Sequence, residues 1–383
     1  MASPISFDEQ ASSASSSDLF QVPLQKGDKA GQTAQRDIHI RLSDGNFEHD
    51  ILACEEDESS LELQEPAQGE RTGPVLTAPV GQGQAVIAFD AADARDTIRS
   101  ELSKLQELRY APVSPQAQRF AEDSRPRTVS WLIQVVSAIG LTRETLHTAI
   151  SLMDRFVAGT EAHPPETVLQ LLALGCLSVA SKHEEVAQHS SDWWVGLAVD
   201  GEGRALYERL DLHRMEWLLL ETVEWRIRVP NMLTFLRQYL AALVCHGVLP
   251  HYPPFVATFK SCAEFLVEVS LFYGELLPFS YSTIAVACLM LANQYCQSVF
   301  AAGAHTSAAA PAPAKCLVSE LAAVLELDPS AIAPGLGRCM GYMGPLYDLV
   351  VRGPFGAAPA DHELGLLAPV VARYRHIASQ VAP

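Results

Sequence analysis

Four charged residues stand beside apolar helical stretches, and their types suit ion pairing better than catalysis. Arg125 begins one stretch and Asp154 lies late in the next, while Lys182 ends a strongly apolar helix and Glu216 belongs to a later one. A charge beside a buried helix needs a partner, because a buried charge without one destabilises the fold. An Arg125–Asp154 pair would join the first two helices, and Lys182 and Glu216 could pair with each other or face another protein. Ordinary solvated charges are the alternative interpretation.

A short peptide in the polar N-terminal region, Leu52-Ala53-Cys54-Glu55-Glu56, is a second candidate site. In an extended chain Leu52, Cys54 and Glu56 point to the same side. The first two can fill small apolar pockets, and the carboxylate can meet backbone amides or a helix N-terminus. A pattern with three specified positions also arises by chance. If this peptide is a site, the pattern predicts that another protein binds it as an extended ligand.

Catalysis by the chain itself has little support. The sequence shows no nucleophile–base set, phosphate-binding loop or metal cluster. His147, His163, His183 and His189 lack the helix-face spacing and cysteine partners of a zinc site, so we expect them at the surface. The glycines of segment 335–341 follow no strand and lack dinucleotide-binding spacing. We therefore expect no enzyme activity, no metal and no cofactor.

Composition narrows the classes of partner. The chain has 383 residues and a net charge of −18, which argues against nucleic acid and against an anionic membrane surface as partners. Its eight cysteines form no CxxC pair, which is typical of reduced thiols in a cytosolic or nuclear protein. No apolar run reaches the roughly 20 residues that span a bilayer. The first residues lack the order of a signal peptide.

The apolar pattern predicts an all-α protein with two helical bundles in tandem. Residues 1–90 are polar and acidic with no sustained period, so we expect a disordered head. Helical periodicity then continues along most of the chain, and no run alternates long enough to predict a strand. We expect a head at 1–90, a first bundle at 91–228, a second at 229–352 and a tail at 353–383.

The first bundle contains the four candidate charges. Gly140 should end its first long helix and Thr142 should cap the next. Pro165 suits the first turn of a third helix, which is apolar nearly all round and should lie at the centre of the bundle. Lys182 at the end of that helix would then reach the surface from a buried element.

These segments resemble the cyclin box. The resemblance rests on Arg125-Pro126-Arg127-Thr128-Val129-Ser130-Trp131, Leu152-Met153-Asp154-Arg155-Phe156, Ala180-Ser181-Lys182-His183-Glu184-Glu185 and Met215-Glu216. The five most characteristic box positions match Arg125, Asp154, Leu171, Lys182 and Glu216, in order. Together with the Leu-x-Cys-x-Glu peptide, the chain looks most like a D-type cyclin of the plant or algal kind.

The resemblance implies two tandem five-helix cyclin folds and a cyclin-dependent kinase as partner. Lys182, His183, Glu185 and Glu216 would contact the kinase, while Arg125–Asp154 would act as an internal brace with Leu171 in the core. Leu52, Cys54 and Glu56 would bind a retinoblastoma-type pocket protein. The implied role is a nuclear regulatory subunit that promotes the G1/S transition. A non-activating adaptor or transcription-related cyclin-box protein is the alternative.

One surface departs from the family. The apolar patch with which some cyclins dock substrate peptides would be altered here, because most of its apolar residues are replaced. Its positions in this chain are Ser124, Arg127, Thr128, Trp131, Gln134 and Gln170. We expect weak docking of Arg-x-Leu peptides on this surface.

Overall fold

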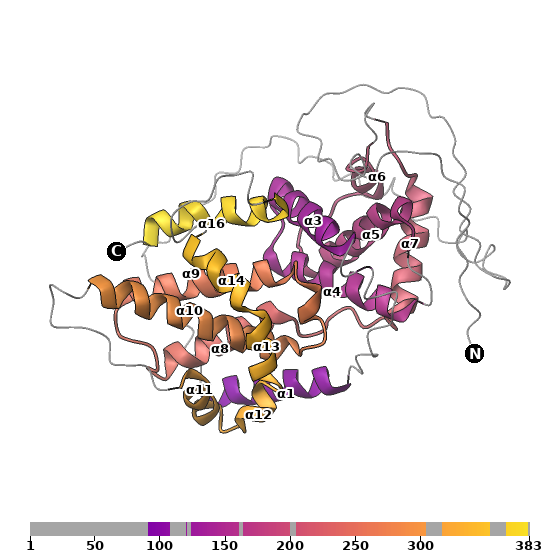
Figure 1. Cartoon of the computed structure of the whole chain (residues 1–383). Coiled ribbons are helices and arrows are strands. Elements are labelled where there is room, and N and C mark those ends of the chain that lie inside the picture. The colour runs from indigo at the N-terminus through magenta and orange to yellow at the C-terminus, as the bar shows by residue number, and fades with distance from the viewer. Residues whose placement is uncertain are drawn as a thin grey trace, which may run out of the picture.

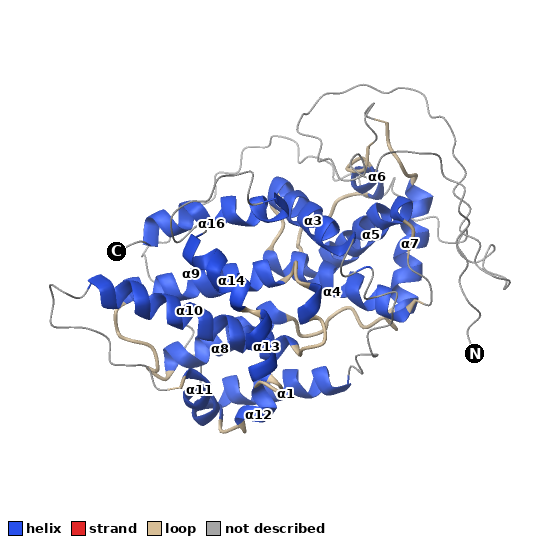
Figure 2. Cartoon of the chain, viewed as in Figure 1, coloured by secondary structure: helices blue, strands red, loops and turns tan. Residues whose placement is uncertain are grey.

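The computed structural model describes residues 91–107, 120, 124–160, 164–199, 204–303, 316–352 and 365–381. Within these ranges the chain is built of helices and loops, and the extended pairing is limited to one bridge between Val199 and Ala205 (Figure 2). The predicted all-α class is confirmed. The head, with the Leu52, Cys54 and Glu56 peptide, lies outside the described residues.

The first repeat is organised around one buried helix. Its central helix α5 packs against α4 and α7 (Figure 1). The local signals act as expected: Gly140 ends α3 with a φ of 76°, and the Thr142 side chain caps α4 by accepting a hydrogen bond from the Thr145 amide. The helices are α3 (Arg125–Ile139), α4 (Arg143–Gly159), α5 (Glu166–Glu184), α6 (Ser191–Val195) and α7 (Arg209–Thr222).

The second repeat has the same plan, with α10 as its central helix packed against α8 and α9. Helix α13 ends at its C-cap Met343, and α14 follows directly. The helices are α8 (Met232–Cys245), α9 (Pro253–Ser270), α10 (Tyr281–Gly303), α11 (Leu317–Leu325), α12 (Pro329–Ile332), α13 (Leu336–Tyr342) and α14 (Gly344–Arg352).

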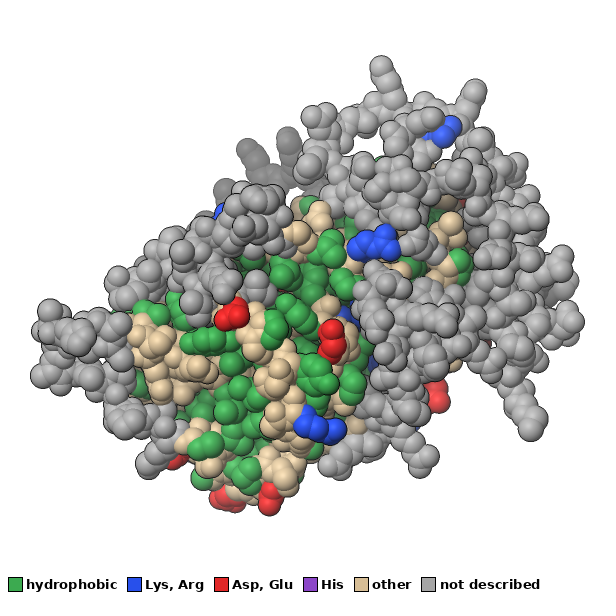
Figure 3. All heavy atoms as spheres, viewed as in Figure 1, with side chains coloured by type: hydrophobic (Ala, Val, Ile, Leu, Met, Phe, Trp, Pro, Cys, Tyr) green, Lys and Arg blue, Asp and Glu red, His purple; other side chains and the backbone are tan. Residues whose placement is uncertain are grey.

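Helix α10 is long and apolar enough, by length and composition, to cross a membrane over Tyr281–Phe300. In the fold 61% of this stretch is buried, as befits the core helix of a repeat. The outer face of the second repeat carries mainly apolar and uncharged polar side chains with scattered charges in the view of Figure 3. The role of α10 is therefore explained by packing within the protein.

Two further helices pack against helices that are distant from them in sequence. Helix α1 (Ala91–Glu107) precedes the first repeat but packs against α8 of the second, with Ile98 and Leu105 buried. Residues 91–228 thus include a helix that packs against the second repeat. Helix α16 (Ala368–Val381), entered through the 3-10 turn η6 (Gly365–Leu367), packs against α3 and α9, so the expected tail contains a docked helix.

The structure brings Arg125 and Asp154 together as a buried, two-pronged ion pair. Arg125 Nε donates to Asp154 Oδ1 at 2.6 Å, and Nη2 donates to Oδ2 at 2.8 Å. The Arg125 side chain is 3% exposed, and its Nη1 donates to the backbone carbonyl of Leu271 at the end of α9. Burial alone would lower the pKa of Arg125, but Asp154 outweighs it and the pKa is raised. The pair thus joins α3, α4 and the second repeat. Leu171 is buried in the same repeat.

Replacing Arg125 should destabilise the whole fold. Arg125→Ala leaves Asp154 buried without its partner and the Leu271 carbonyl without its donor, a loss of roughly 3–5 kcal/mol. Arg125→Lys keeps the charge but not the planar fork, so part of the loss should remain. Urea unfolding of each variant measures this, with the exposed Lys260→Ala of α9 as control. Equal midpoints for Arg125→Ala and the control would show that the pair contributes nothing.

Candidate functional site

The exposed end of the buried helix α5 carries an ion pair. Lys182 Nζ donates to both carboxylate oxygens of Glu216 in α7, at 3.0 and 2.8 Å. The Lys182 side chain is 47% exposed, whereas that of Glu216 is 11% exposed. The structure therefore pairs the two candidate contact residues with each other and leaves the lysine accessible. His183 beside them is exposed.

Two exposed tryptophans lie on or just after the helix that carries Glu216, and the sequence analysis did not identify them as site residues. Trp217 directly follows Glu216 in α7, and Trp225 lies just after that helix. Their rings meet edge to face with centroids 5.5 Å apart. Trp217 is 38% exposed and Trp225 is 56% exposed. Large exposed aromatic side chains are enriched where proteins bind one another.

The turn that presents Trp225 is held in an unusual backbone conformation. Glu224 and Trp225 have φ values of 54° and 58°, in the left-handed region that non-glycine residues rarely adopt. Arg155 of α4 supports the turn by donating to the carbonyls of Arg226 at 2.6 Å and Val223 at 3.1 Å. The helix α4 thereby fixes where the exposed tryptophan projects.

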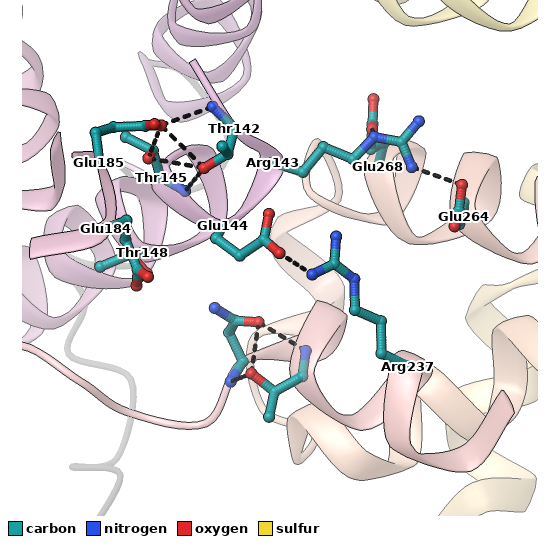
Figure 4. Close-up of polar contacts among 12 residues, drawn as sticks. Thr142, Arg143, Glu144, Thr145, Thr148, Glu184, Glu185, Arg237, Glu264 and Glu268 are labelled. Atoms are coloured by element: carbon teal, nitrogen blue, oxygen red, sulfur yellow. Dashed lines mark hydrogen bonds and ion pairs between the residues drawn. The ribbon is translucent and has the colours of Figure 1, made fainter. Parts of the chain in front are cut away.

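Glu185, which the resemblance implied as a kinase contact, is partly exposed and binds the start of α4 (Figure 4). Its Oε1 accepts hydrogen bonds from the Thr142 amide at 2.7 Å, the Thr142 hydroxyl at 2.9 Å and the Thr145 hydroxyl. Glu184 accepts a further hydrogen bond from Thr148 at 2.9 Å. Both carboxylates thus hold the end of α5, which carries Lys182, against α4. Glu185 is a positioning residue in this geometry.

The same start of α4 is tied to the second repeat by ion pairs (Figure 4). Arg143 Nη1 lies 2.6 Å from Glu264, and its Nε lies 3.1 Å from Glu268, both in α9. Glu144 forms an ion pair with Arg237 of α8. The orientation of the α5 end is therefore linked to the contact between the two repeats.

The six docking-patch positions do not form an open apolar groove. Ser124, Thr128, Trp131 and Gln170 are buried, with exposures of 4%, 0%, 1% and 1%. Neither polar atom of the Gln170 side chain has a hydrogen-bond partner among the described residues. The partly exposed positions, Arg127 and Gln134, are polar, and Gln134 donates to Ser130 at 3.3 Å. Five of the six positions belong to α3 or its N-cap, and Gln170 belongs to α5.

The arrangement is suited to binding rather than to chemistry. Among the described residues no group of three or more His, Cys, Asp or Glu could hold a metal ion. His147, expected at the surface, is instead 2% exposed, and burial together with Arg143 and Arg373 lowers its pKa to about 3. Within residues 190–199, the segment Ser191–Val195 forms the short helix α6, and its Trp194 is buried.

Two tandem helical repeats, with a paired lysine and glutamate at the end of the central helix of the first, define a cyclin-fold protein. Residues 95–228 match the family described as the cyclin N-terminal domain, and residues 230–310 match the cyclin C-terminal domain. Together these matches cover more than half of the chain. The chain belongs to the cyclin family.

Similar proteins carry A-type and mitotic names rather than D-type names. Cyclin-A2-2 of Arabidopsis thaliana is 29% identical over 204 residues, which cover 53% of this chain and 44% of that protein. G2/mitotic-specific cyclin-2 of Medicago sativa is 32% identical over 45% of this chain and 47% of its own length. Human Cyclin-A1 is 30% identical over 49% of this chain and 41% of its own. The chain spans less than half the length of these relatives.

The anchor at Glu185 predicts a pH dependence of stability. Burial alone would raise the pKa of Glu185, but the hydrogen bonds from Thr145 and Thr142 lower it below its ordinary value of 4.5. A carboxyl group with a lowered folded-state pKa stabilises the fold above its unfolded pKa, and this contribution is lost as the pH falls through the folded pKa. Glu185→Gln should therefore be less stable than wild type at neutral pH, with the difference shrinking in acid.

Thermal unfolding from pH 7 down to pH 3 measures the difference, and Glu221→Gln, on the exposed side of α7, is the matched control. A gap between wild type and Glu185→Gln that stays constant over this range would mean that the carboxylate is not the source of the anchor.

Proposed function

We propose that this cyclin binds and activates a cyclin-dependent kinase through the surface formed by Lys182, Glu216, Trp217 and Trp225. The observation that carries the proposal is the Lys182–Glu216 pair, with N–O distances of 3.0 and 2.8 Å, at the exposed end of a buried helix. The pair offers ammonium protons and carboxylate oxygens to backbone or side-chain groups of a partner. Trp217 and Trp225, on and just after the helix that carries Glu216, would supply apolar area for the same contact.

Rigid support favours this surface as a binding site. Glu184 and Glu185 hold the end of α5 through threonines of α4, and Arg155 of the same helix holds the turn before Trp225. A surface that is already ordered loses little conformational entropy on association, so more of the contact energy remains as affinity. The binding groups thus project from a preorganised framework.

The cyclin itself would carry out no reaction. A kinase is active when its regulatory helix supplies the glutamate that pairs with the ATP-site lysine. A protein that binds only that position of the helix shifts an existing equilibrium towards the active state. A preorganised surface without catalytic groups is sufficient for this role.

We further propose that the head peptide directs the kinase to a retinoblastoma-type pocket protein in the nucleus, which would place the chain at the G1/S transition as a D-type cyclin. The support is the sequence Leu52-x-Cys54-x-Glu56, followed by the acidic Asp57 and Glu58. The acids would favour encounter with a basic pocket rim. Affinity would come from the two apolar side chains and the carboxylate of Glu56.

A second candidate is a mitotic kinase activator that makes no pocket-protein contact. The observation that favours it is the set of A-type and G2/mitotic names among the similar proteins. The two candidates share the kinase surface and differ only in the head peptide. Binding of the peptide to a pocket protein therefore discriminates between them.

Removing either member of the ion pair should weaken kinase binding. Lys182→Ala or Glu216→Ala should cost roughly 2–5 kcal/mol of association, at least about 30-fold in Kd, because a charged partner group loses its contact in the interface. Pull-down and calorimetry with a purified cyclin-dependent kinase measure this, together with its activity on a peptide substrate. The non-activating adaptor is favoured if the wild-type chain binds the kinase without raising its activity.

Circular dichroism separates lost contact from lost fold. Lys182→Ala should keep its helical signal but melt at a lower temperature than wild type, because Glu216, whose side chain is 11% exposed, loses its partner. The exposed Lys260→Ala in α9 is the matched control and should bind the kinase as wild type does. Kinase binding unchanged in both Lys182→Ala and Glu216→Ala would refute the proposed surface.

The head peptide should bind without the fold. A synthetic segment spanning Asp50 to Glu58 should bind a retinoblastoma-type pocket protein, and Cys54→Gly with Glu56→Lys should abolish binding, because one pocket contact is lost and the charge at the anion site is reversed. Fluorescence polarisation measures the peptide, with Glu55→Gln, at a variable position of the motif, as control. Full-length doubly substituted protein that still retains the pocket protein at wild-type yield would show that this peptide is not the contact. A wild-type chain that retains no pocket protein would favour the mitotic candidate.

A further inference from the structure

Helix α16 packs against α3 of the first repeat and α9 of the second (Figure 1). It belongs to residues 365–381, which follow both stretches matched by the cyclin domains, 95–228 and 230–310. The helix therefore adds a contact between the repeats that the two domains alone do not supply.

The inner side of α16 is apolar and fully buried. Val370, Val371 and Tyr374 each have 0% exposure, and their spacing places them on one side of the helix. The ring of Tyr374 meets Phe265 of α9 edge to face, with centroids 5.4 Å apart. The guanidinium of Arg143 from α4 lies 5.2 Å from the centre of the same ring. Tyr374 is thus enclosed by groups from both repeats.

A buried acid in α9, under α16, specifies which helix can bind at this surface. Glu268 of α9 is 1% exposed and accepts hydrogen bonds from Arg373 at 2.9 Å and from the Tyr374 hydroxyl at 3.1 Å. Arg143 lies 3.1 Å from the same carboxylate. Arg373 also donates to Ser137 of α3. Without α16, Glu268 would keep one of these three partners, a costly state for a buried carboxylate.

The turn before the helix covers α3 itself. Ser130 donates to the carbonyl of Leu366 in η6 at 3.0 Å, and Gln134 donates to the same Ser130 hydroxyl at 3.3 Å. Ser130 and Ser137 are two turns apart on α3, and the C-terminal segment contacts both. The segment thus lies along the edge of α3 that carries Gln134, one of the docking-patch positions.

We propose that the faces of α3 and α9 that α16 covers form a binding surface for an amphipathic helix with an inward arginine and tyrosine, and that residues 365–381 occupy it as an intramolecular strap. The strap ties the two repeats together and closes one edge of α3. Release of the strap would open that edge to a helix of the same chemistry from another protein. The strap covers other helices than the proposed kinase surface does, because Lys182 and Glu216 belong to α5 and α7 whereas α16 packs against α3 and α9.

A chain ending at residue 364 tests the strap in trans. A labelled peptide of residues 365–381 should bind this shortened chain, and should bind the full chain roughly 100-fold more weakly, because the tethered segment competes at high effective concentration. Arg373→Ala in the peptide should weaken binding roughly tenfold, since Glu268 loses a charged partner. Ala372→Gln, at an exposed position of α16, is the matched control and should change binding by no more than about twofold.

A shortened chain that keeps its helical signal and cooperative melting but does not bind the peptide would overturn the proposal. Should the shortened chain fail to fold, hydrogen exchange of the full chain decides. Amides of α16 that open before those of α9 and α10, and open faster in Arg373→Ala, support a releasable strap. Exchange of α16 only through global unfolding would make it an inseparable part of the second repeat and exclude the strap.

Discussion

The fold depends on burying one arginine–carboxylate pair between two helical repeats. Arg125 uses two nitrogens on Asp154 and a third on the Leu271 carbonyl, so a single guanidinium joins α3, α4 and the end of α9. Arginine suits this place because its planar fork satisfies several acceptors at once without giving up its charge. A buried pair need not add stability relative to an apolar core, but it penalises every arrangement in which one partner is left alone. Its strongest effect is therefore on how the repeats are oriented.

From this brace the order extends outward along α4. Its first turn holds Glu185 and thereby the end of α5, and Arg143 and Glu144 in that turn contact the second repeat. Its later part supplies Asp154 to the brace and Arg155 to the turn that presents Trp225. One helix thus connects the inter-repeat contact with both sides of the candidate kinase surface. A change in the angle between the repeats would be felt at Lys182 through a short series of direct contacts.

The sequence allowed the prediction of the helices of the first repeat, because Gly140, Thr142 and Pro165 mark their ends and the apolar pattern marks their inner faces. It also allowed the pairing of Arg125 with Asp154, since a charge in a core requires a partner. The contact of Glu185 with the start of α4 was not predicted, because its partners Thr142 and Thr145 are about 40 residues away in sequence. The placements of α1 and α16 were missed for the same reason: an apolar stripe shows that a helix is covered on one side, but not by which repeat.

The charged residues of the described helices and those of residues 50–70 are arranged differently. The chain is acidic overall, at −18, yet the acids that organise the described fold are paired: Asp154 with Arg125, Glu216 with Lys182, and Glu268 with Arg143 and Arg373. Each pair joins elements from different parts of the chain, so each acts as a selective link between helices whose apolar faces alone would tolerate sliding. Residues 50–70 contain eight acidic residues and no lysine or arginine. They are suited to long-range attraction of a basic partner, which needs net charge rather than a defined pair.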